Sequence, residues 1–311
     1  MIAFGPVPSR RLGQSLGINN IPPKVCTYAC AYCQLGRTIR MQIERQEFYQ
    51  PEEIKRDVED KVERANESGD GIDYLTFVPD GEPTLDLNLC REIELLRSVG
   101  IKIAVITNAS LLWREDVREA LIQADWVSLK IDATEEGIWR QVDRPHGKLQ
   151  LAAVLKGALE FAQVYRGELT TETMLVKGVN DDAQHLGRVA GFLAWLRPSV
   201  AYLSIPTRPP AENWVRPPAE AAVNRAFQIY GSELERVELL TGYEGNAFAF
   251  TGNVEEDLLD ITAVHPMREE AVDEYLGRAG ASWSVVQNLI ARGQLVKVGY
   301  GGQRFLLRNL H

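Results

Sequence analysis

The sequence is poor in cysteine and histidine, and it lacks long apolar runs. Its 311 residues include four cysteines and four histidines. Three of the cysteines fall between positions 26 and 33, which is not the pattern of a disulfide framework. No uncharged apolar run approaches the roughly 18 residues that a membrane span needs, and the first residues lack the apolar stretch of a signal peptide. We therefore expect a cytoplasmic protein whose cysteines serve metal or redox chemistry.

Positive charge is also in deficit. The chain has 34 lysines and arginines against 43 aspartates and glutamates, a net charge of −9. Such a charge repels nucleic acids and anionic membranes on average, although a local basic patch can override an average. Nucleic acid is therefore a partner that the charge does not favour, and no membrane partner is expected. The hydrophobic content of 45% is ordinary for a folded protein.

Short apolar runs alternate with longer stretches of helical periodicity, which indicates βα units and a largely parallel sheet. Strands are expected near residues 14–19, 73–78, 101–106, 126–131, 170–177 and 200–205. Helices are expected near residues 51–68, 86–99, 113–123, 148–164, 182–196 and 217–231. Six such pairs fall short of the eight of a closed barrel. The predicted fold class is α/β, a partial (β/α)6 barrel with a wide lateral opening.

Two changes of pattern suggest how the chain is organised. Residues 207–218 hold four prolines and indicate an extended segment over the barrel mouth. After residues 242–248 the pattern changes to three helices and a hairpin with Gly301–Gly302 at its turn. This is the element order of a winged helix-turn-helix module. We expect a barrel domain over residues 1–250 and a C-terminal winged-helix domain over residues 251–311.

Three cysteines follow a strand and a proline pair, on a loop where a barrel keeps its active site. Cys26, Cys30 and Cys33 are spaced so that their thiolates can surround one face of an iron–sulfur cluster. A structural zinc site or an electron-transfer cluster is normally closed by four protein ligands, whereas three leave one metal open to a small molecule. Cys90 is the one spare thiol, and its amphipathic segment predicts a buried core residue.

The cysteine spacing, with aromatic Tyr32 before the last thiol, resembles the signature of the radical SAM superfamily over roughly residues 10–245. The resemblance implies a [4Fe–4S] cluster on the three cysteines, with S-adenosylmethionine (SAM) on the fourth iron and Tyr32 among the cofactor-binding residues. It also implies an external electron donor of the flavodoxin or ferredoxin type. Reductive cleavage of SAM would then give a 5′-deoxyadenosyl radical that attacks the substrate.

Residues after the second strand resemble the Gly-Gly-Glu-Pro segment of the family, which holds the ammonium group of SAM. Gly81 and Glu82 match it, whereas Asp80 replaces the first glycine. The alternative is a plain Gly-Pro turn into a helix that is capped by Thr84 or Asp86.

Polar residues after later strands are also assigned to SAM through the resemblance. Asn108, Ser128 and Lys130 would contact its ribose or carboxylate, and Val176 would lie against its adenine. The alternatives are that Asn108 caps the helix near residue 113, and that the Val176 segment is a strand end followed by an Asn-Asp helix cap.

The motifs DGEPTL and CQLGRT most resemble radical SAM proteins related to the tRNA wyosine-forming enzymes. Those enzymes hold a second cluster, for which this chain lacks the cysteines. Residues 253–311 carry six basic and eight acidic residues, a net charge of −2. The C-terminal module is therefore expected to contact protein or present substrate rather than bind nucleic acid.

The predicted function is a radical SAM enzyme that modifies an unknown substrate, with RNA and protein as candidate classes. The alternatives are a glycyl-radical activating enzyme, an iron–sulfur redox-sensing winged-helix regulator and a zinc-binding structural site. A basic rim at the barrel mouth is a further hypothesis, whose rival is ordinary surface pairing with carboxylates. The arginines concerned are Arg10, Arg11, Arg37, Arg208 and Arg216.

Overall fold

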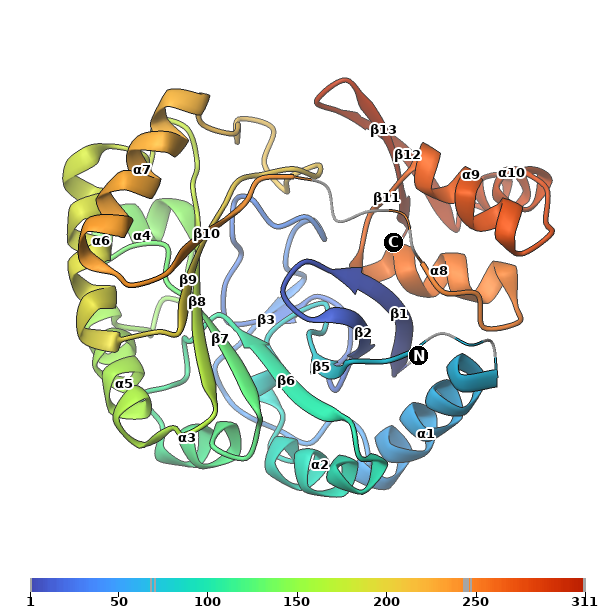
Figure 1. Cartoon of the computed structure of the whole chain (residues 1–311), viewed down its shortest axis with the longest axis horizontal. Helices are drawn as coiled ribbons and strands as arrows, with labels where there is room; N and C mark the ends of the chain where they lie inside the picture. The colour runs from blue at the N-terminus through green and yellow to red at the C-terminus, as the bar shows by residue number, and fades with distance from the viewer. Residues whose placement is uncertain (1, 68, 70, 243–245, 247, 310–311) are drawn as a thin grey trace.

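The computed structural model describes residues 2–67, 69, 71–242, 246 and 248–309 (Figure 1). Its main feature is an eight-stranded sheet, in the order β1-β2-β5-β6-β7-β8-β9-β10, that curls into a half-barrel. β1 runs antiparallel to β2, and the later strands are parallel to their neighbours. The bounds are β1 (Ala3–Ser9), β2 (Gly13–Ile18), β5 (Tyr74–Phe77), β6 (Lys102–Thr107), β7 (Trp126–Lys130), β8 (Glu168–Met174), β9 (Val200–Ser204) and β10 (Val237–Leu240).

The six predicted strands are confirmed as β2 and β5 to β9, but the count of six is wrong because each edge carries one more strand. β1 contains two prolines and a glycine, which argue against a central strand but are tolerated at an edge. β10 is only four residues long and partly exposed. Neither segment therefore shows the apolar alternation by which a strand is recognised.

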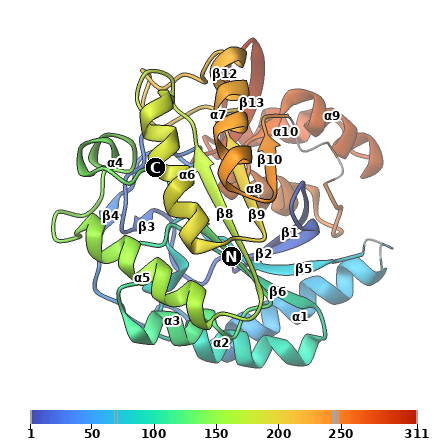
Figure 2. The same cartoon turned by 60° about the vertical axis from the view of Figure 1, so that its left-hand side comes forward.

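Helices cover the outer face of the curled sheet. Figure 2 shows α5, α6 and α7 in front of β8 and β9. The predicted helix over residues 86–99 is α2 followed by a 3₁₀ turn at Arg97–Val99, and a separate 3₁₀ turn at Pro83–Leu85 precedes it. The helix α4 was not predicted. The bounds are α1 (Pro51–Glu67), α2 (Leu89–Leu96), α3 (Glu115–Leu121), α4 (Glu136–Val142), α5 (Leu151–Val164), α6 (Ala183–Leu196) and α7 (Glu220–Glu233).

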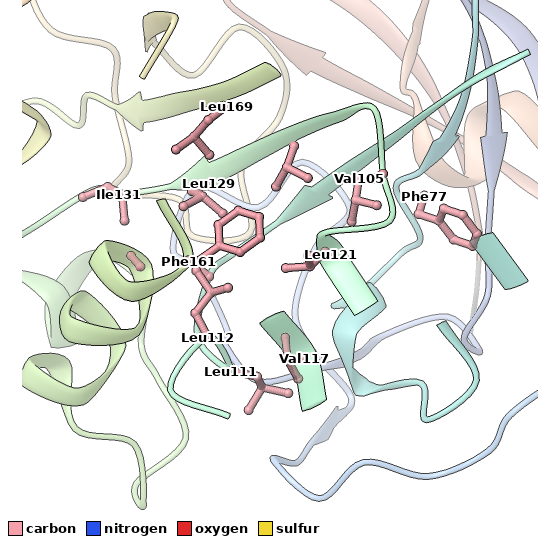
Figure 3. Packing of buried hydrophobic residues seen from close by; sticks show 14 of the residues in the cluster. Phe77, Val105, Leu111, Leu112, Val117, Leu121, Leu129, Ile131, Phe161 and Leu169 are labelled. Carbon is pink, nitrogen blue, oxygen red and sulfur yellow. The ribbon is translucent and has the colours of Figure 1, made fainter. Parts of the chain in front are cut away.

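The main core lies between the sheet and these helices (Figure 3). Phe161 of α5 and Leu121 of α3 are fully buried against strand residues such as Leu129. The buried positions of α5 recur every three or four residues, so one face of the helix is apolar. Each such buried side chain contributes about 1.5–3 kcal/mol relative to exposure.

The inside of the half-barrel is filled at the N-terminal end of its strands. Leu12 from the β1–β2 turn packs there with Trp126 and Tyr202 in a separate apolar cluster. The cavity that the described residues leave inside the half-barrel opens toward the C-terminal ends of the strands.

The β1–β2 turn also crosses the open side of the half-barrel. Arg10 donates from Nη2 to the carbonyl oxygen of Leu240, at the end of β10, over 3.2 Å. Arg11 donates from Nη1 to Glu172 Oε2 of β8 over 2.7 Å. The lateral opening predicted from the strand count is therefore bridged by these two arginines.

The C-terminal elements appear in the predicted order. A three-stranded sheet, β11-β13-β12, packs with three helices, and the hairpin turn has positive φ at Gly301 and Gly302. The bounds are α8 (Val254–Val264), β11 (Met267–Arg268), α9 (Glu269–Arg278), α10 (Ser284–Ala291), β12 (Leu295–Tyr300) and β13 (Gln303–Arg308).

This C-terminal part shares a core with the barrel. Phe4 and Val7 of β1 belong to the same buried cluster as the apolar residues of α8, α9 and α10. Lys61 of α1 forms a buried ion pair with Asp260 of α8, at 3.5 Å. The predicted boundary segment, residues 242–248, lies partly outside the described residues. No helix among the described residues is long and apolar enough to cross a membrane.

Candidate functional site

A cavity of about 360 Å³ opens at the C-terminal ends of the parallel strands. Strand ends meet at one edge of such a sheet, so residues far apart in sequence come together there. The three clustered cysteines line the cavity, together with five further predicted residues. These are Tyr32, Gly81, Glu82, Asn108 and Lys130.

The cysteine loop begins at a short parallel pair of strands, β3 (Val25–Cys26) and β4 (Arg40–Met41). All three cysteines are free thiols. Burial raises the pKa of each thiol, and it raises that of Cys26 to about 12. Buried thiols of this kind ionise only when a cation compensates, and a bound metal deprotonates them outright. Within the described residues, no three His, Cys, Asp or Glu side chains already surround a position for a single metal ion.

Tyr32 connects the cysteine loop to two buried carboxyls. Its hydroxyl is hydrogen-bonded to Asp132 and donates to Asp143 Oδ1 over 3.1 Å. The Cys30 Sγ lies 3.7 Å from the same Asp143 oxygen. Burial, and then the charge of Asp132, raise the pKa of Asp143 well above its ordinary value. The neutral form of Asp143 is therefore favoured more than that of an exposed carboxyl, and its side chain supports the loop beside Cys30.

Lys130 lies over the ring of Tyr32, with Nζ 4.9 Å from the ring centroid. Lys130 Nζ also donates to Glu172 Oε1 over 2.8 Å, and Arg11 binds the other oxygen. Burial alone would lower the pKa of Lys130, but Glu172 and Asp132 together outweigh it and the pKa is raised. Burial alone would raise the pKa of Glu172, but the two cations lower it. The network stays ionised and positively charged in the cavity floor.

Gly81 permits a close approach that no other residue allows. A Cβ atom at this position would lie 1.9 Å from the backbone oxygen of Val25. The cysteine loop and the segment after β5 are thus in direct backbone contact at Gly81. They are also paired as an isolated bridge between Val25 and Gly81.

Glu82 is buried and accepts several hydrogen bonds. Its carboxylate accepts from the hydroxyls of Thr84 and Thr107, each over 2.6 Å, and from the backbone N–H of Asn108 over 2.8 Å. Burial raises the pKa of Glu82, and these bonds oppose that rise. Glu82 itself caps the 3₁₀ turn at Pro83–Leu85. The helix that follows is α2, and its N-cap is Asn88, so neither Thr84 nor Asp86 caps it.

Asn108 points its amide at the cysteine loop. Its Nδ2 donates to Thr27 Oγ1 over 2.7 Å and lies 3.6 Å from Cys26 Sγ. Its Oδ1 accepts from the backbone N–H of Ser110 over 3.0 Å. The N-cap of α3 is Arg114, so Asn108 does not cap that helix.

Ser128 and Val176 do not line the cavity. Ser128 lies on the same face of β7 as Lys130, one repeat deeper toward Trp126. Val176 is fully buried against Ala31 and Val215.

The residues after Val176 are organised as a helix cap. The Asn180 side chain binds the Val176 N–H through Oδ1 over 2.8 Å. Asp182 caps α6 by accepting from two backbone N–H groups. The segment is therefore a strand end followed by a helix cap, but the capping residue is Asp182 and not the Asn180-Asp181 pair of the alternative.

The structure adds Lys24, Gln34 and His265 to the cavity, which the sequence did not single out. Lys24 and Asp80 form an ion pair at 3.2 Å, and both side chains are buried. His265, from the end of α8, lines the cavity, and its Nε2 lies 2.9 Å from Arg208 Nη2. Gln34 accepts from Arg208 Nη1 over 2.8 Å. No local pattern announces such contacts, because their partners are far away in the sequence.

The predicted basic rim is present in part. Arg10, Arg11 and Arg208 line the cavity, whereas Arg37 and Arg216 are not among its lining residues. Arg37 pairs with Glu212 at 3.2 Å. Cys90 is half-buried on α2, where it packs against the edge of the main core rather than within it, and it does not line the cavity.

Comparison with known protein families gives a match over more than half of the chain. A family model described as the radical SAM superfamily matches residues 20–189. A UPF0026 protein from Methanocaldococcus jannaschii is 48% identical over 311 residues, which covers 99% of this chain and 96% of that protein. A UPF0026 protein from Helicobacter pylori is 37% identical over 215 residues, which covers 67% of each chain.

Solved structures share the fold at low sequence identity. A radical SAM methyltransferase from Sphaerobacter thermophilus matches with a TM-score of 0.54 and 17% identity, over 73% of this chain and 66% of that one. SuiB from Streptococcus suis, bound to S-adenosylmethionine, matches with a TM-score of 0.53 and 13% identity, over 72% and 49%. These similarities are evidence for the half-barrel fold alone.

Family membership confirms the expected cofactors. Radical SAM enzymes use a [4Fe–4S] cluster and SAM, and they need an external reductant. The chain therefore belongs to the radical SAM superfamily, as a member of the UPF0026 family.

Proposed function

We propose that Cys26, Cys30 and Cys33 bind the [4Fe–4S] cluster and that the cavity beside them holds SAM. The observation that carries this proposal is that three free, half-buried thiols line one cavity at the strand ends. Cys90, the remaining cysteine, does not line it. The raised pKa values of the thiols fit a group that supplies positive charge on binding.

The bound cofactors would supply one-electron cleavage of SAM to a 5′-deoxyadenosyl radical, which takes a hydrogen atom from the substrate. The chain's own residues position and shield the reactants. We assign the ammonium group of SAM to the Gly81–Glu82 segment, where a buried carboxylate lies among backbone groups. Asn108 and Lys130 present donors to the same cavity and are assigned to the carboxylate or ribose of SAM.

Ser128 and Val176 act indirectly in this proposal. Ser128 would support Lys130 from one repeat deeper in β7, and Val176 would hold the segment that covers Ala31 in the cysteine loop. Tyr32 would position Lys130 through the contact with its ring.

Water is kept from the reacting groups by elements that are distant in sequence. The β1–β2 turn bridges the lateral opening through Arg10, and Arg208 of the proline-rich segment contacts His265 of the C-terminal part. Exclusion of water protects a radical from side reactions. We therefore assign a lid function to residues 207–218.

We propose a cytoplasmic enzyme that modifies RNA or protein and is related to the wyosine-forming branch, on the strength of the DGEPTL and CQLGRT motifs. The C-terminal elements have the order of a winged helix, and His265 at the end of α8 reaches the cavity. This placement favours a role in presenting substrate. No contact among the described residues favours a glycyl-radical activating enzyme or a regulator.

Anaerobic reconstitution with iron and sulfide tests the proposal. We expect about four of each per chain, and release of 5′-deoxyadenosine from SAM in the presence of dithionite. Stoichiometric zinc, with no nucleoside product, would contradict the proposal and favour a structural metal site.

A further inference from the structure

An exposed strip lies on the outer side of Cys26. In the β3–β4 pair, Met41 is the partner of Cys26. The backbone N–H groups of Ile39 and Arg40 both donate to the oxygen of Lys24, over 3.1 and 3.0 Å. Neighbouring strands lie about 4.8 Å apart, so the strip is one strand away from a cluster-binding thiol.

Three side chains of this strip are apolar and exposed. Ile39 is 67% exposed, Met41 37% and Leu87 47%. Leu87 joins the strip because its N–H donates to the Gln46 oxygen over 3.0 Å, while Arg40 donates to the Gln46 side chain over 3.5 Å. Exposed apolar side chains that gather beside polar ones mark interaction sites. We call Ile39, Arg40, Met41 and Leu87 the outer strip.

The outer strip also carries positive charge on a chain whose net charge is −9. Arg40 has no carboxylate within ion-pair distance among the described residues, while Arg37 pairs with Glu212 and remains exposed. The nearest acidic residues along the chain, Glu44 and Glu47, follow the strip rather than interrupt it. The negative net charge of the chain repels an acidic partner protein, whereas the positive charge of the outer strip attracts it.

We propose that the outer strip is the docking site of an acidic one-electron carrier protein of the flavodoxin or ferredoxin type. This rests on the proposed function, since it assumes that Cys26 binds the cluster. In the docked complex the reduced carrier is oxidised by one electron and the cluster is reduced by one, with no bond made or broken. Weak redox encounters use small interfaces, which suits a strip of four side chains.

Docking on this side leaves the substrate side clear. The cavity that we assign to SAM faces Cys26 from the side of Asn108, whose amide lies 3.6 Å from the sulfur. The carrier would approach from the side of Met41, across the short β3–β4 pair. Electron delivery and substrate binding therefore do not compete for space.

The test compares two reductants on the reconstituted full chain. The double variant Ile39→Glu with Arg40→Glu reverses the charge and removes the apolar contact of the outer strip. Cluster reduction is followed by stopped-flow absorbance, with reduced flavodoxin as the protein reductant and dithionite as the small one. We expect the half-saturating flavodoxin concentration to rise by about tenfold, with the dithionite rate unchanged. Higher salt should weaken wild-type docking and affect the variant little.

Arg225→Glu with Phe227→Glu is the matched control, because both side chains are exposed on α7, away from the cysteine loop. It should leave both reductants unaffected. If the double variant fails to assemble the cluster, the milder pair Ile39→Thr with Arg40→Gln replaces it.

An unchanged flavodoxin dependence in the strip variant would overturn the docking proposal, as would an equal slowing with dithionite. A wild-type chain that assembles no cluster for dithionite to reduce would instead overturn the proposed function.

Discussion

Lys24 and Asp80 form a buried ion pair in the cavity wall, with Nζ 3.2 Å from Oδ2. Asp80 stands where the radical SAM pattern has a glycine, and the Lys24 N–H donates to the Asp80 backbone oxygen over 2.7 Å. Burial raises the pKa of Asp80 to about 6, against the opposing charge of Lys24. The pair links the cysteine loop to the Gly81–Glu82 segment. Asp80, which departs from the family pattern, is therefore matched by Lys24 as its ion-pair partner.

Asp80→Ala should destabilise the fold, because it leaves the Lys24 ammonium buried without a counter-charge. Loss of one member of a buried pair costs about 3–5 kcal/mol, and we expect the free energy of unfolding in urea to fall by about 3 kcal/mol. The double variant Lys24→Met with Asp80→Ala should recover more than half of this loss. Equal losses in the single and double variants would show that the unpaired charge is not the cause.

Gly81→Ala should disrupt the site, because the new Cβ would lie 1.9 Å from the Val25 oxygen. That oxygen belongs to the backbone, so it cannot avoid the clash by a side-chain rotation. We expect a lower melting temperature and at least about a tenfold loss of SAM affinity, measured by calorimetry on reconstituted protein. Gly191→Ala on α6 is the control, since nothing lies within 4 Å of its added Cβ. That change should stabilise the helix by about 0.5–1 kcal/mol. Wild-type SAM affinity in Gly81→Ala would contradict the close approach.

Glu92 and Asp86 are buried carboxyls whose charges act on each other, and Asp86 Oδ2 and Glu92 Oε1 have no hydrogen-bond donor among the described residues. Burial, and then the charge of Asp86, raise the pKa of Glu92 far above its ordinary 4.5. Since the folded pKa is raised, the stability that the proton contributes is complete below about pH 4.5 and is lost as pH rises toward the folded pKa.

Glu92→Gln supplies a permanent donor in place of the proton on Glu92. Its melting temperature should therefore fall less than that of the wild type between neutral and alkaline pH. Glu92→Ala, which removes the carboxyl altogether, should be less stable than both proteins at neutral pH. Parallel pH profiles for the wild type and Glu92→Gln would show that the pair does not hold a proton.

The sequence predicted the elements whose apolar pattern is local and strong. β5 to β9 and the C-terminal order of helices and hairpin followed from periodicity, whereas β1 was hidden by its prolines and β10 by its shortness. α4 was missed because only Trp139 and Val142 of its seven residues are buried, which leaves too little pattern to recognise.

Site residues that belong to a sequence motif could be predicted. Site residues that depend on contacts between distant parts of the chain could not. Glu82 and Asn108 follow strand ends, and their approach to the cysteine loop could be expected from the sheet alone. Glu172 and His265 could not be found this way, because their importance comes from Arg11 and Arg208, which are distant along the chain. Ser128 was expected at the barrel mouth but lies one repeat deeper. Alternation shows which face of a strand a residue is on, but not how far from the strand end side chains fill the barrel interior.

Iron and sulfide content of single cysteine variants tests the central claim most directly. Cys26→Ala, Cys30→Ala and Cys33→Ala should each lose most of the reconstituted iron and all release of 5′-deoxyadenosine. Cys90→Ala, which changes a half-buried thiol away from the cavity, should keep both at the wild-type level. Full iron content and undiminished nucleoside release in any one of the first three variants would contradict the account.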